Sequence, residues 1–196
     1  MTRAIYRPPW RIDLDVRDGV TSPVSGAVLA RVVAAALDAA GAPSPASIGL
    51  ILADDAELAN LNSTHMGKDG PTDVLSFPLL SPAVFPAHAG QPHARTDTRA
   101  FALPPGRRPH LGDIVVSVER AVEQAVSGRG GHSGDVRWSG ADELRLLATH
   151  GALHVCGWDH ADPNEEAAMR ALETRLLGER ASDARTGEHQ VRHSAG

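Results

Sequence analysis

The sequence predicts a single-domain α+β fold, with about four short strands and about five helices. Three observations indicate this class: an alternating strand pattern near the N-terminus, an alanine-rich amphipathic helix after it, and two capped helices in the last third. A few short strands among helices form a single α+β domain. A chain of 196 residues is also long enough to bury a core.

The first half of the chain contains two strand patterns and two helix patterns. Residues 10–19 alternate apolar and polar side chains, with the period of a half-buried strand. Residues 25–43 carry an apolar stripe on an alanine-rich helix. A second strand covers 47–54, and a short helix follows it, with Asp54 as its N-cap and Glu57 completing a capping box.

The middle of the chain is predicted as two strands separated by a long loop. Residues 71–80 form the third strand, and the fourth, Asp113 to Ser117, continues into a helix. Residues 81–110 hold six prolines and no sustained apolar period, which indicates a surface loop. The stretch 128–138 is glycine- and serine-rich and predicts a second loop.

The last third is predicted as two helices and a tail. Ser139 caps a long helical pattern, and Asp162 caps a final helix that has Pro163 at its first position. Residues 179–196 have almost no apolar content, so we expect a disordered tail. The predicted domain therefore covers 1–178, with the two loops as insertions.

The composition indicates a soluble, cytoplasmic protein without membrane contact. No run of eighteen apolar residues is present, and the N-terminus lacks the apolar region of a signal peptide. The single cysteine excludes an internal disulfide and fits a reducing compartment. The net charge of −5 weighs against a nucleic-acid partner, although a local basic groove can still bind phosphates.

Three histidines in H-x3-H-x5-H spacing, His150, His154 and His160, form the clearest candidate site. The first two lie four residues apart on a predicted helix, so their imidazoles share one face and can reach one ion at about 2 Å. Gly157 can end this helix in the left-handed conformation, and the returning chain can bring His160 to a third corner. Three neutral imidazoles and an open fourth position are typical of a catalytic zinc site, with one Zn²⁺ per chain and a metal-activated water.

Other interpretations of the histidines are open. The spacing can be a coincidence in a histidine-rich chain, or the zinc can be structural, with Cys156 or Asp159 as a further ligand. Cys156 lies about 200° around the helix from His154, which favours a packing role. We expect Asp159 to hold the second N–H of a histidine. Gly151 stands where a zinc protease carries its general-base glutamate, which counts against a peptidase.

Two more segments complete a pattern with the histidine motif: LNSTHMGKDGPTDVLSFP at 61–78 and LGDIVVS at 111–117. Together the three blocks resemble the YbeY family of bacterial metal-dependent endoribonucleases, over residues 12–178. The resemblance implies a small mixed sheet and a zinc ion bound by the three histidines. It also implies cleavage of single-stranded RNA in 3′-end maturation of small-subunit (16S) ribosomal RNA and in ribosome quality control. The implied partners are ribosomal RNA and the ribosome or its small-subunit proteins.

One position departs from the family pattern. Many members carry Tyr-Arg before Gly-Lys-Asp, and the resemblance assigns that arginine to RNA contact, whereas this chain has His65 and Met66. Lys68, the only lysine, can supply the missing charge, as can Arg107 or Arg108. Alternatively, Lys68 is a solvated turn residue.

Asp73 and Ser76 are polar residues in a strand that otherwise has a buried pattern. Buried polar groups need partners. Two interpretations follow: these side chains form hydrogen bonds that order the adjacent loops, or they lie on the wall of the site and contact substrate.

Zinc chemistry suits phosphodiester cleavage without the protease's glutamate. Zinc lowers the pKa of a bound water to about 7 and polarises a phosphoryl oxygen, and RNA also carries its own nucleophile in the 2′-OH. The sequence leaves both routes open. It also leaves open another zinc hydrolase, and a non-catalytic ribosome-assembly factor with a structural zinc, which Met66 and the acidic net charge favour.

Overall fold

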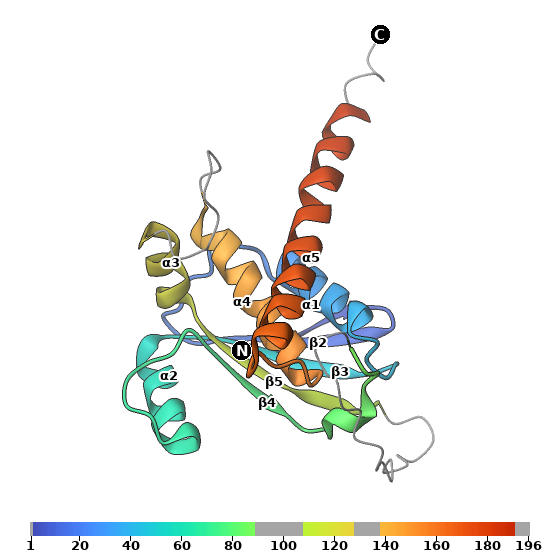
Figure 1. Cartoon of the computed structure of the whole chain (residues 1–196). Coiled ribbons are helices and arrows are strands. Elements are labelled where there is room, and N and C mark those ends of the chain that lie inside the picture. Colours follow the sequence, from blue (N-terminus) through green and yellow to red (C-terminus); the bar gives the residue numbers. More distant parts are fainter. Residues whose placement is uncertain (1, 89–107, 128–137, 191–196) are drawn as a thin grey trace.

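The computed structural model describes residues 2–88, 108–127 and 138–190, with side chains in the last range described as far as residue 178. A five-stranded sheet forms one layer, in the order β1-β2-β3-β5-β4 (Figure 1). Strands β2, β3 and β5 are parallel, and the edge strands β1 and β4 run antiparallel to their neighbours. The α+β class and the mixed sheet are therefore confirmed. The strands are Thr2–Arg7 (β1), Trp10–Val16 (β2), Ser47–Ala53 (β3), Val74–Pro78 (β4) and His110–Ser117 (β5).

The prediction of four strands was wrong by one, because it missed β1. Most side chains of this edge strand are exposed, and only Ile5 and Arg7 are half-buried. An edge strand that buries so little carries no alternating apolar pattern, which is the signal that reveals strands in a sequence. The hydrogen bonds that form β1 come from its antiparallel pairing with β2.

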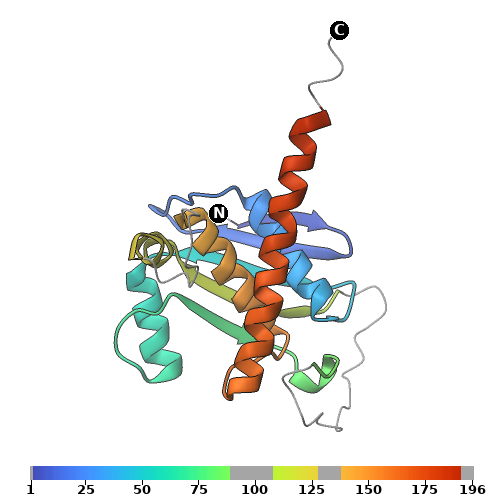
Figure 2. The same ribbon diagram turned by 45° about the horizontal axis from the view of Figure 1, so that its top comes forward.

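Five α-helices lie within the described residues: Gly26–Ala39 (α1), Asp55–Leu61 (α2), Val118–Ser127 (α3), Gly140–Val155 (α4) and Pro163–Gln190 (α5). Helices α1 and α4 pack against the sheet, and α5 packs on both of them (Figures 1 and 2). Helix α2 contacts β5 from the opposite face. None of the described helices is long and apolar enough to cross a membrane.

Helix α5 continues to Gln190, so the first part of the tail that was expected to be disordered is helical. Both views show this end of α5 extending away from the rest of the protein (Figures 1 and 2). Low apolar content argues against packing, but residues 179–190 are rich in Glu, Arg and Ala, which favour helix without it. Residues 191–196 lie outside the described residues.

The two predicted loops fall largely outside the described residues. The first opens with a short 3₁₀ helix, Pro82–Val84, and ends at β5, which begins at His110, three residues earlier than expected. Residues 89–107 and 128–137 are not described. Whether these loops are insertions into the domain stays a prediction.

The alternation of side chains along β5 divides the core into two clusters. Ile114 and Val116 face α1 and α4 and belong to the main core. Val115 faces the other way and packs with Leu58 of α2 and Leu75 of β4 in a small second cluster. Because successive strand residues point to opposite faces, one strand can serve both layers.

The caps expected at three helices are present in full or in part. Ser139 and Asp142 form a reciprocal capping box at the start of α4, and Asp162 accepts hydrogen bonds from backbone N–H groups at the start of α5. Asp54 caps α2 through the backbone N–H of Glu57 at 2.8 Å. The other half of that predicted box is replaced, because the Glu57 carboxylate pairs with Arg17 at 2.7 Å.

Gly151 allows α4 to approach the sheet closely. A Cβ atom at this position would lie 2.5 Å from Ile114 Cγ2, 3.2 Å from Val74 Cγ2 and 3.3 Å from Ser76 Oγ. The carbonyl of Gly151 accepts a hydrogen bond from the Ser76 hydroxyl at 3.1 Å. The position after the first histidine therefore faces the sheet, and a glutamate side chain there would enter the core.

We predict opposite effects for alanine at two helical glycines. In an open helix, Gly→Ala stabilises by up to about 1 kcal/mol, and Gly178 of α5 has no neighbouring atom that a Cβ would meet. At Gly151 the clash with Ile114 outweighs this gain, so Gly151→Ala should lower the free energy of unfolding by about 1–3 kcal/mol. Urea unfolding of both variants measures the difference. An equal or stabilising effect at Gly151 would contradict the close packing.

Candidate metal centre

The end of α4 brings the third histidine toward the other two. The helix ends at Val155, and Gly157 adopts a left-handed φ of 83°, as the sequence predicts. Two hydrogen bonds close the turn: the N–H of Gly157 donates to the His154 carbonyl at 3.0 Å, and that of Trp158 to the Leu153 carbonyl at 3.1 Å. This is the Schellman arrangement, which reverses the chain at a helix end.

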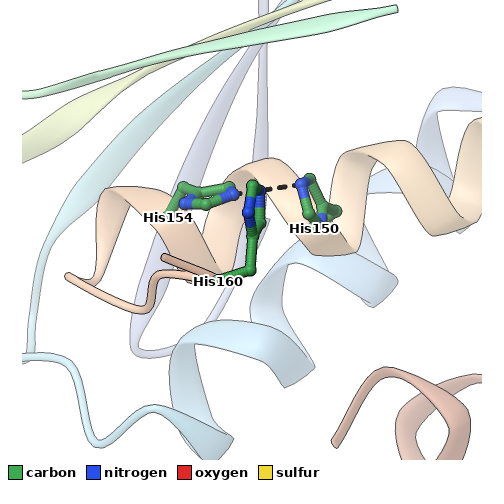
Figure 3. Close-up of side chains that lie close together, drawn as sticks. All are labelled: His150, His154 and His160. Carbon is green, nitrogen blue, oxygen red and sulfur yellow. Dashed lines mark hydrogen bonds between the residues drawn. The ribbon is translucent and has the colours of Figure 1, made fainter. Parts of the chain in front are cut away.

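The three histidine rings converge on one point (Figure 3). One ring nitrogen from each of His150, His154 and His160 lies within 4.8 Å of the others. Nε2 of His150 and Nε2 of His154 are 3.0 Å apart. Nitrogen ligands that share one zinc ion at about 2 Å lie within about 4 Å of each other, so small side-chain rotations would bring the rings to one ion.

The environment of His154 keeps its imidazole neutral. Its pKa is lowered from 6.5 to about 4, first by burial and then by the charges that His150 and His160 carry when protonated. A hydrogen bond with the Trp158 backbone and the charge of Asp159 oppose this shift only in part. A neutral imidazole has a lone pair for a metal ion, and a protonated one has none.

A buried carboxylate on α5 contacts the cluster. Oε1 of Glu173 lies 2.7 Å from Nδ1 of His150, and Glu173 is only 8% exposed. Sequence reasoning missed this residue. A signal was present, because Met169, Leu172 and Leu176 form the apolar stripe of α5 and Glu173 stands within it.

Asp159 was expected to hold a histidine ring and Cys156 to pack in the core, and the described contacts agree with the expectation for Cys156 alone. The Asp159 carboxylate accepts from the backbone N–H of its neighbour His160 at 2.8 Å, and none of its described hydrogen bonds reaches a histidine ring. Cys156 is buried in the main core, and burial raises the pKa of its thiol to about 12. Neither is among the residues that converge in the cluster.

A cavity of about 710 Å³ opens beside the histidines. Its walls come from β4, from the end of α4 with its turn, and from the segment 62–73 that precedes β4. Three residues singled out from the sequence, Lys68, Asp73 and Ser76, line this cavity together with the histidines. Residues far apart in the chain thus form one site wall.

The amino-acid sequence matches one protein family over most of its length. The family described as Endoribonuclease YbeY matches residues 18–181. The chain belongs to the YbeY family. Endoribonuclease YbeY of Salinispora tropica is 44% identical over 72% of this chain and 79% of its own length. The proteins of the same name from Roseiflexus castenholzii and Mycolicibacterium paratuberculosis are 36% and 39% identical, over 85% and 84% of this chain and 91% and 79% of their own.

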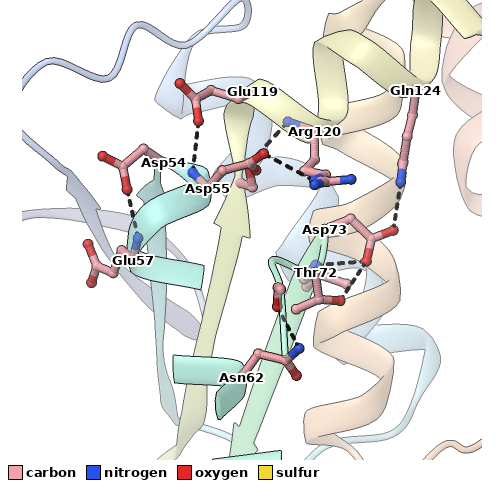
Figure 4. A network of polar contacts seen from close by, with 12 residues as sticks. Asp54, Asp55, Glu57, Asn62, Thr72, Asp73, Glu119, Arg120 and Gln124 are labelled. Carbon is pink, nitrogen blue, oxygen red and sulfur yellow. Dashed lines mark hydrogen bonds and ion pairs between the residues drawn. The ribbon is translucent and has the colours of Figure 1, made fainter. Parts of the chain in front are cut away.

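In this member of the YbeY family, Asp73 and Ser76 have structural partners as well as a place at the cavity. Asp73 Oδ1 accepts from the Thr72 hydroxyl and the Val74 backbone, and Oδ2 accepts from Gln124 of α3 at 3.1 Å (Figure 4). Ser76 donates to the Gly151 carbonyl. These bonds support the first interpretation, in which the two side chains order the site, and their contact with substrate stays a proposal.

Lys68 lies at the rim of the cavity. A π-helical turn, Asn62–Met66, ends at Gly67 in the left-handed conformation, and exposed Lys68 follows. The buried Asn62 side chain holds this segment by donating to the Gly70 carbonyl at 2.9 Å (Figure 4). Met66 also lines the cavity and is 48% exposed.

The two arginines considered as substitutes for the family arginine are not part of the described site. The Arg108 guanidinium donates to the backbone carbonyls of Pro9 and Ala46, at the start of the sheet, and does not line the cavity. Arg107 lies outside the described residues. Lys68 is therefore the candidate cation that the described structure brings to the site.

The residues present fit a divalent metal ion such as zinc. Three imidazole nitrogens converge, one of them is kept neutral by its surroundings, and the cavity borders the cluster. Imidazole suits zinc and other borderline divalent metals, and three protein ligands leave a position open for water or substrate.

We predict that the metal-free protein loses stability in acid because of His154. The unfolded chain takes up a proton there near pH 6.5, whereas the folded chain resists until about pH 4. Between pH 7 and pH 4 the free energy of unfolding should therefore fall by about 3 kcal/mol more in the wild type than in His154→Gln. Urea unfolding with a chelator present measures this, and equal pH dependence in both proteins would contradict it.

Proposed function

We propose that this member of the YbeY family is a zinc-dependent endoribonuclease that cuts single-stranded RNA. One observation carries the proposal: three imidazole nitrogens converge at the wall of a cavity, in a chain whose relatives are named endoribonucleases. Three histidines with an open position are a donor set of hydrolytic zinc sites. We assign the nuclease to residues 1–178.

The biological substrate in this proposal is the 3′ end of small-subunit (16S) ribosomal RNA. Maturation of that end and ribosome quality control in the cytoplasm are the roles that the family resemblance implies, with the ribosome or its small-subunit proteins as partners. What supports the proposal is the chemistry of the site, together with a family name that specifies an RNA substrate.

His150, His154 and His160 would hold the metal, which supplies a Lewis acid for a phosphoryl oxygen and lowers the pKa of a water. The chain's own residues provide the surroundings. Lys68 places an ammonium group at the rim, where it attracts the phosphates that flank the scissile bond. Asp73 and Ser76 hold β4 to α3 and α4, and so keep the cavity wall in place beneath the substrate.

The position of Gly151 argues against a peptidase. In a zinc protease the residue after the first histidine supplies the general base. Here a side chain at 151 would meet Ile114 of the sheet, so no carboxylate can reach the cavity from this position. RNA cleavage can proceed without a carboxylate at this position, because a bound zinc ion would lower the pKa of a water, which could then act as the nucleophile or take the proton of the RNA 2′-OH.

A second candidate is a non-catalytic ribosome-assembly factor in which the metal only stabilises the fold. Two observations favour it: Met66 replaces the arginine of the family pattern, and the cavity is lined by three carboxylates, Asp69, Asp73 and Asp159, against one lysine. These carboxylates repel RNA when no cation is bound. The two candidates differ in whether the metal-loaded chain turns over RNA.

His154→Ala should abolish RNA cleavage, because it removes one of the three candidate ligands. The fold should remain intact, because the His154 side chain is only half-buried. We expect the rate to fall at least about 100-fold, measured on a single-stranded RNA from the 16S 3′ end with far-ultraviolet circular dichroism as the fold check. His110→Ala, a half-exposed histidine outside the cavity, is the matched control.

The products of that experiment also separate the possible routes. A 2′,3′-cyclic phosphate at the cut end indicates attack by the 2′-OH, whereas a linear phosphate from the start indicates water. Equal cleavage by wild type and His154→Ala would contradict the proposed centre. An inactive wild type that unfolds when the metal is removed supports the assembly factor.

Lys68→Ala should weaken RNA binding across sequences, because it removes the cation at the cavity rim. We expect an affinity about 3- to 10-fold lower and a salt dependence whose slope is reduced by about 0.7–1, the contribution of one phosphate contact. Fluorescence anisotropy with labelled RNA at several salt concentrations measures both. Arg170→Ala, which removes an exposed cation of α5 that pairs with Glu166, is the control. An unchanged slope in Lys68→Ala would identify Lys68 as a solvated turn residue.

A further inference from the structure

Glu173 is one of the few charged side chains that the described structure buries. It is 8% exposed and stands among Met169, Leu172 and Leu176, which belong to the main core. Burial of an unpaired carboxylate is costly, so such a group is retained only with a partner. The partner is the imidazole of His150, 23 residues earlier in the chain, at 2.7 Å from Nδ1 to Oε1.

This contact decides which nitrogen of His150 is free. An ionised carboxylate only accepts hydrogen bonds, so opposite an ionised Glu173 the proton of this contact lies on Nδ1 of His150. In a neutral imidazole the other nitrogen then has the lone pair. That nitrogen, Nε2, lies 3.0 Å from Nε2 of His154, on the side where the three rings converge.

We propose that Glu173 is a positioning residue for the metal centre: it holds His150 in the tautomer and orientation that present Nε2 to the ion. The inference rests on the proposed function, because it takes the histidine cluster to be a metal centre. Metal-bound histidines commonly donate their second N–H to a carboxylate, and loss of that partner typically costs 10- to 100-fold in metal affinity, as an order of magnitude.

Glu173 takes the place that the sequence suggested for Asp159. The Asp159 carboxylate accepts from the His160 backbone instead, and His154 is held by the Trp158 backbone. Among the described hydrogen bonds, His150 is the one ring of the three with a carboxylate partner. Helix α5 therefore acts on the centre through the Glu173 side chain, and none of its described residues is among the three converging ligands.

A purely structural role is the alternative, since the same contact also joins α5 to α4. The two roles predict different effects on the bound metal ion. A structural residue changes the stability of the chain, whereas a positioning residue changes the affinity and the spectrum of the bound metal. Glu173→Leu fits the apolar surroundings and removes the acceptor, and Glu173→Gln keeps an acceptor oxygen without the charge.

The test measures metal binding in the full chain, without RNA. Zinc affinity by competition with a chelator should fall about 10- to 100-fold in Glu173→Leu and by a smaller factor in Glu173→Gln. The absorption spectrum of the cobalt-loaded protein should shift in Glu173→Leu and be largely restored in Glu173→Gln. Glu166→Gln, which changes a half-exposed glutamate of the same helix, should leave both readouts at wild-type values.

Zinc affinity within 2-fold of wild type, with an unchanged cobalt spectrum in Glu173→Leu, would overturn the positioning role even if the variant is less stable. A wild-type chain that binds no zinc would overturn this inference and the proposed metal dependence together. A wild type that binds zinc tightly but cuts no RNA would overturn the proposed nuclease alone, and the effect of Glu173 on zinc affinity would still support its positioning role.

Discussion

Helix α4 approaches the sheet so closely at Gly151 that no side chain fits between them, and the site depends on this contact. His150 and His154 project from the same helix, so their position over the cavity is set by how deeply the helix lies against β4 and β5. The hydrogen bond from Ser76 to the Gly151 carbonyl fastens the helix at the same level. This close packing determines where the candidate ligands lie. It also excludes a side chain at position 151, where a zinc protease carries its general-base glutamate.

Two further structural features outside α4, a glycine turn and helix α5, complete the cluster. The left-handed Gly157 turns the chain back, so that His160 joins two histidines with which it shares no helical face. Helix α5 then covers α4 and brings Glu173 against His150. The turn positions His160 and the carboxylate orients His150, and a metal centre requires its ligands to be fixed in this way.

The polar groups around the cavity are mostly engaged with the protein itself. Asp73 accepts hydrogen bonds from Thr72, Val74 and Gln124, and Asn62 donates to the Gly70 carbonyl (Figure 4). Groups with such partners keep a wall rigid and have less capacity to read the bases of a substrate. Under the proposed function, such a wall favours recognition of the RNA by its phosphates and its shape.

Local patterns in the sequence were sufficient for much of this fold and for the candidate ligands. Period-two and period-3.6 apolar patterns located β2, β3, α1 and α4, and the spacing of His150 and His154 with Gly157 predicted that the histidines converge, because the features involved lie within a few residues of one another. The edge strand β1 buries too little to carry such a pattern, and the continuation of α5 to Gln190 has no apolar period in the sequence that would indicate it.

The sequence by itself therefore predicted that the three histidines form one site, that Gly157 makes the turn that joins them, and that the chain belongs to the YbeY family. Only the tertiary structure decided that Glu173 rather than Asp159 holds a ring, that Gly151 lies against Ile114, and that Lys68 stands at the same cavity as the cluster. The physical reason is sequence separation. Glu173 and His150 are 23 residues apart, and Ile114 and Lys68 lie even farther from the histidine helix along the chain, so no local period or cap encodes which of these segments will meet.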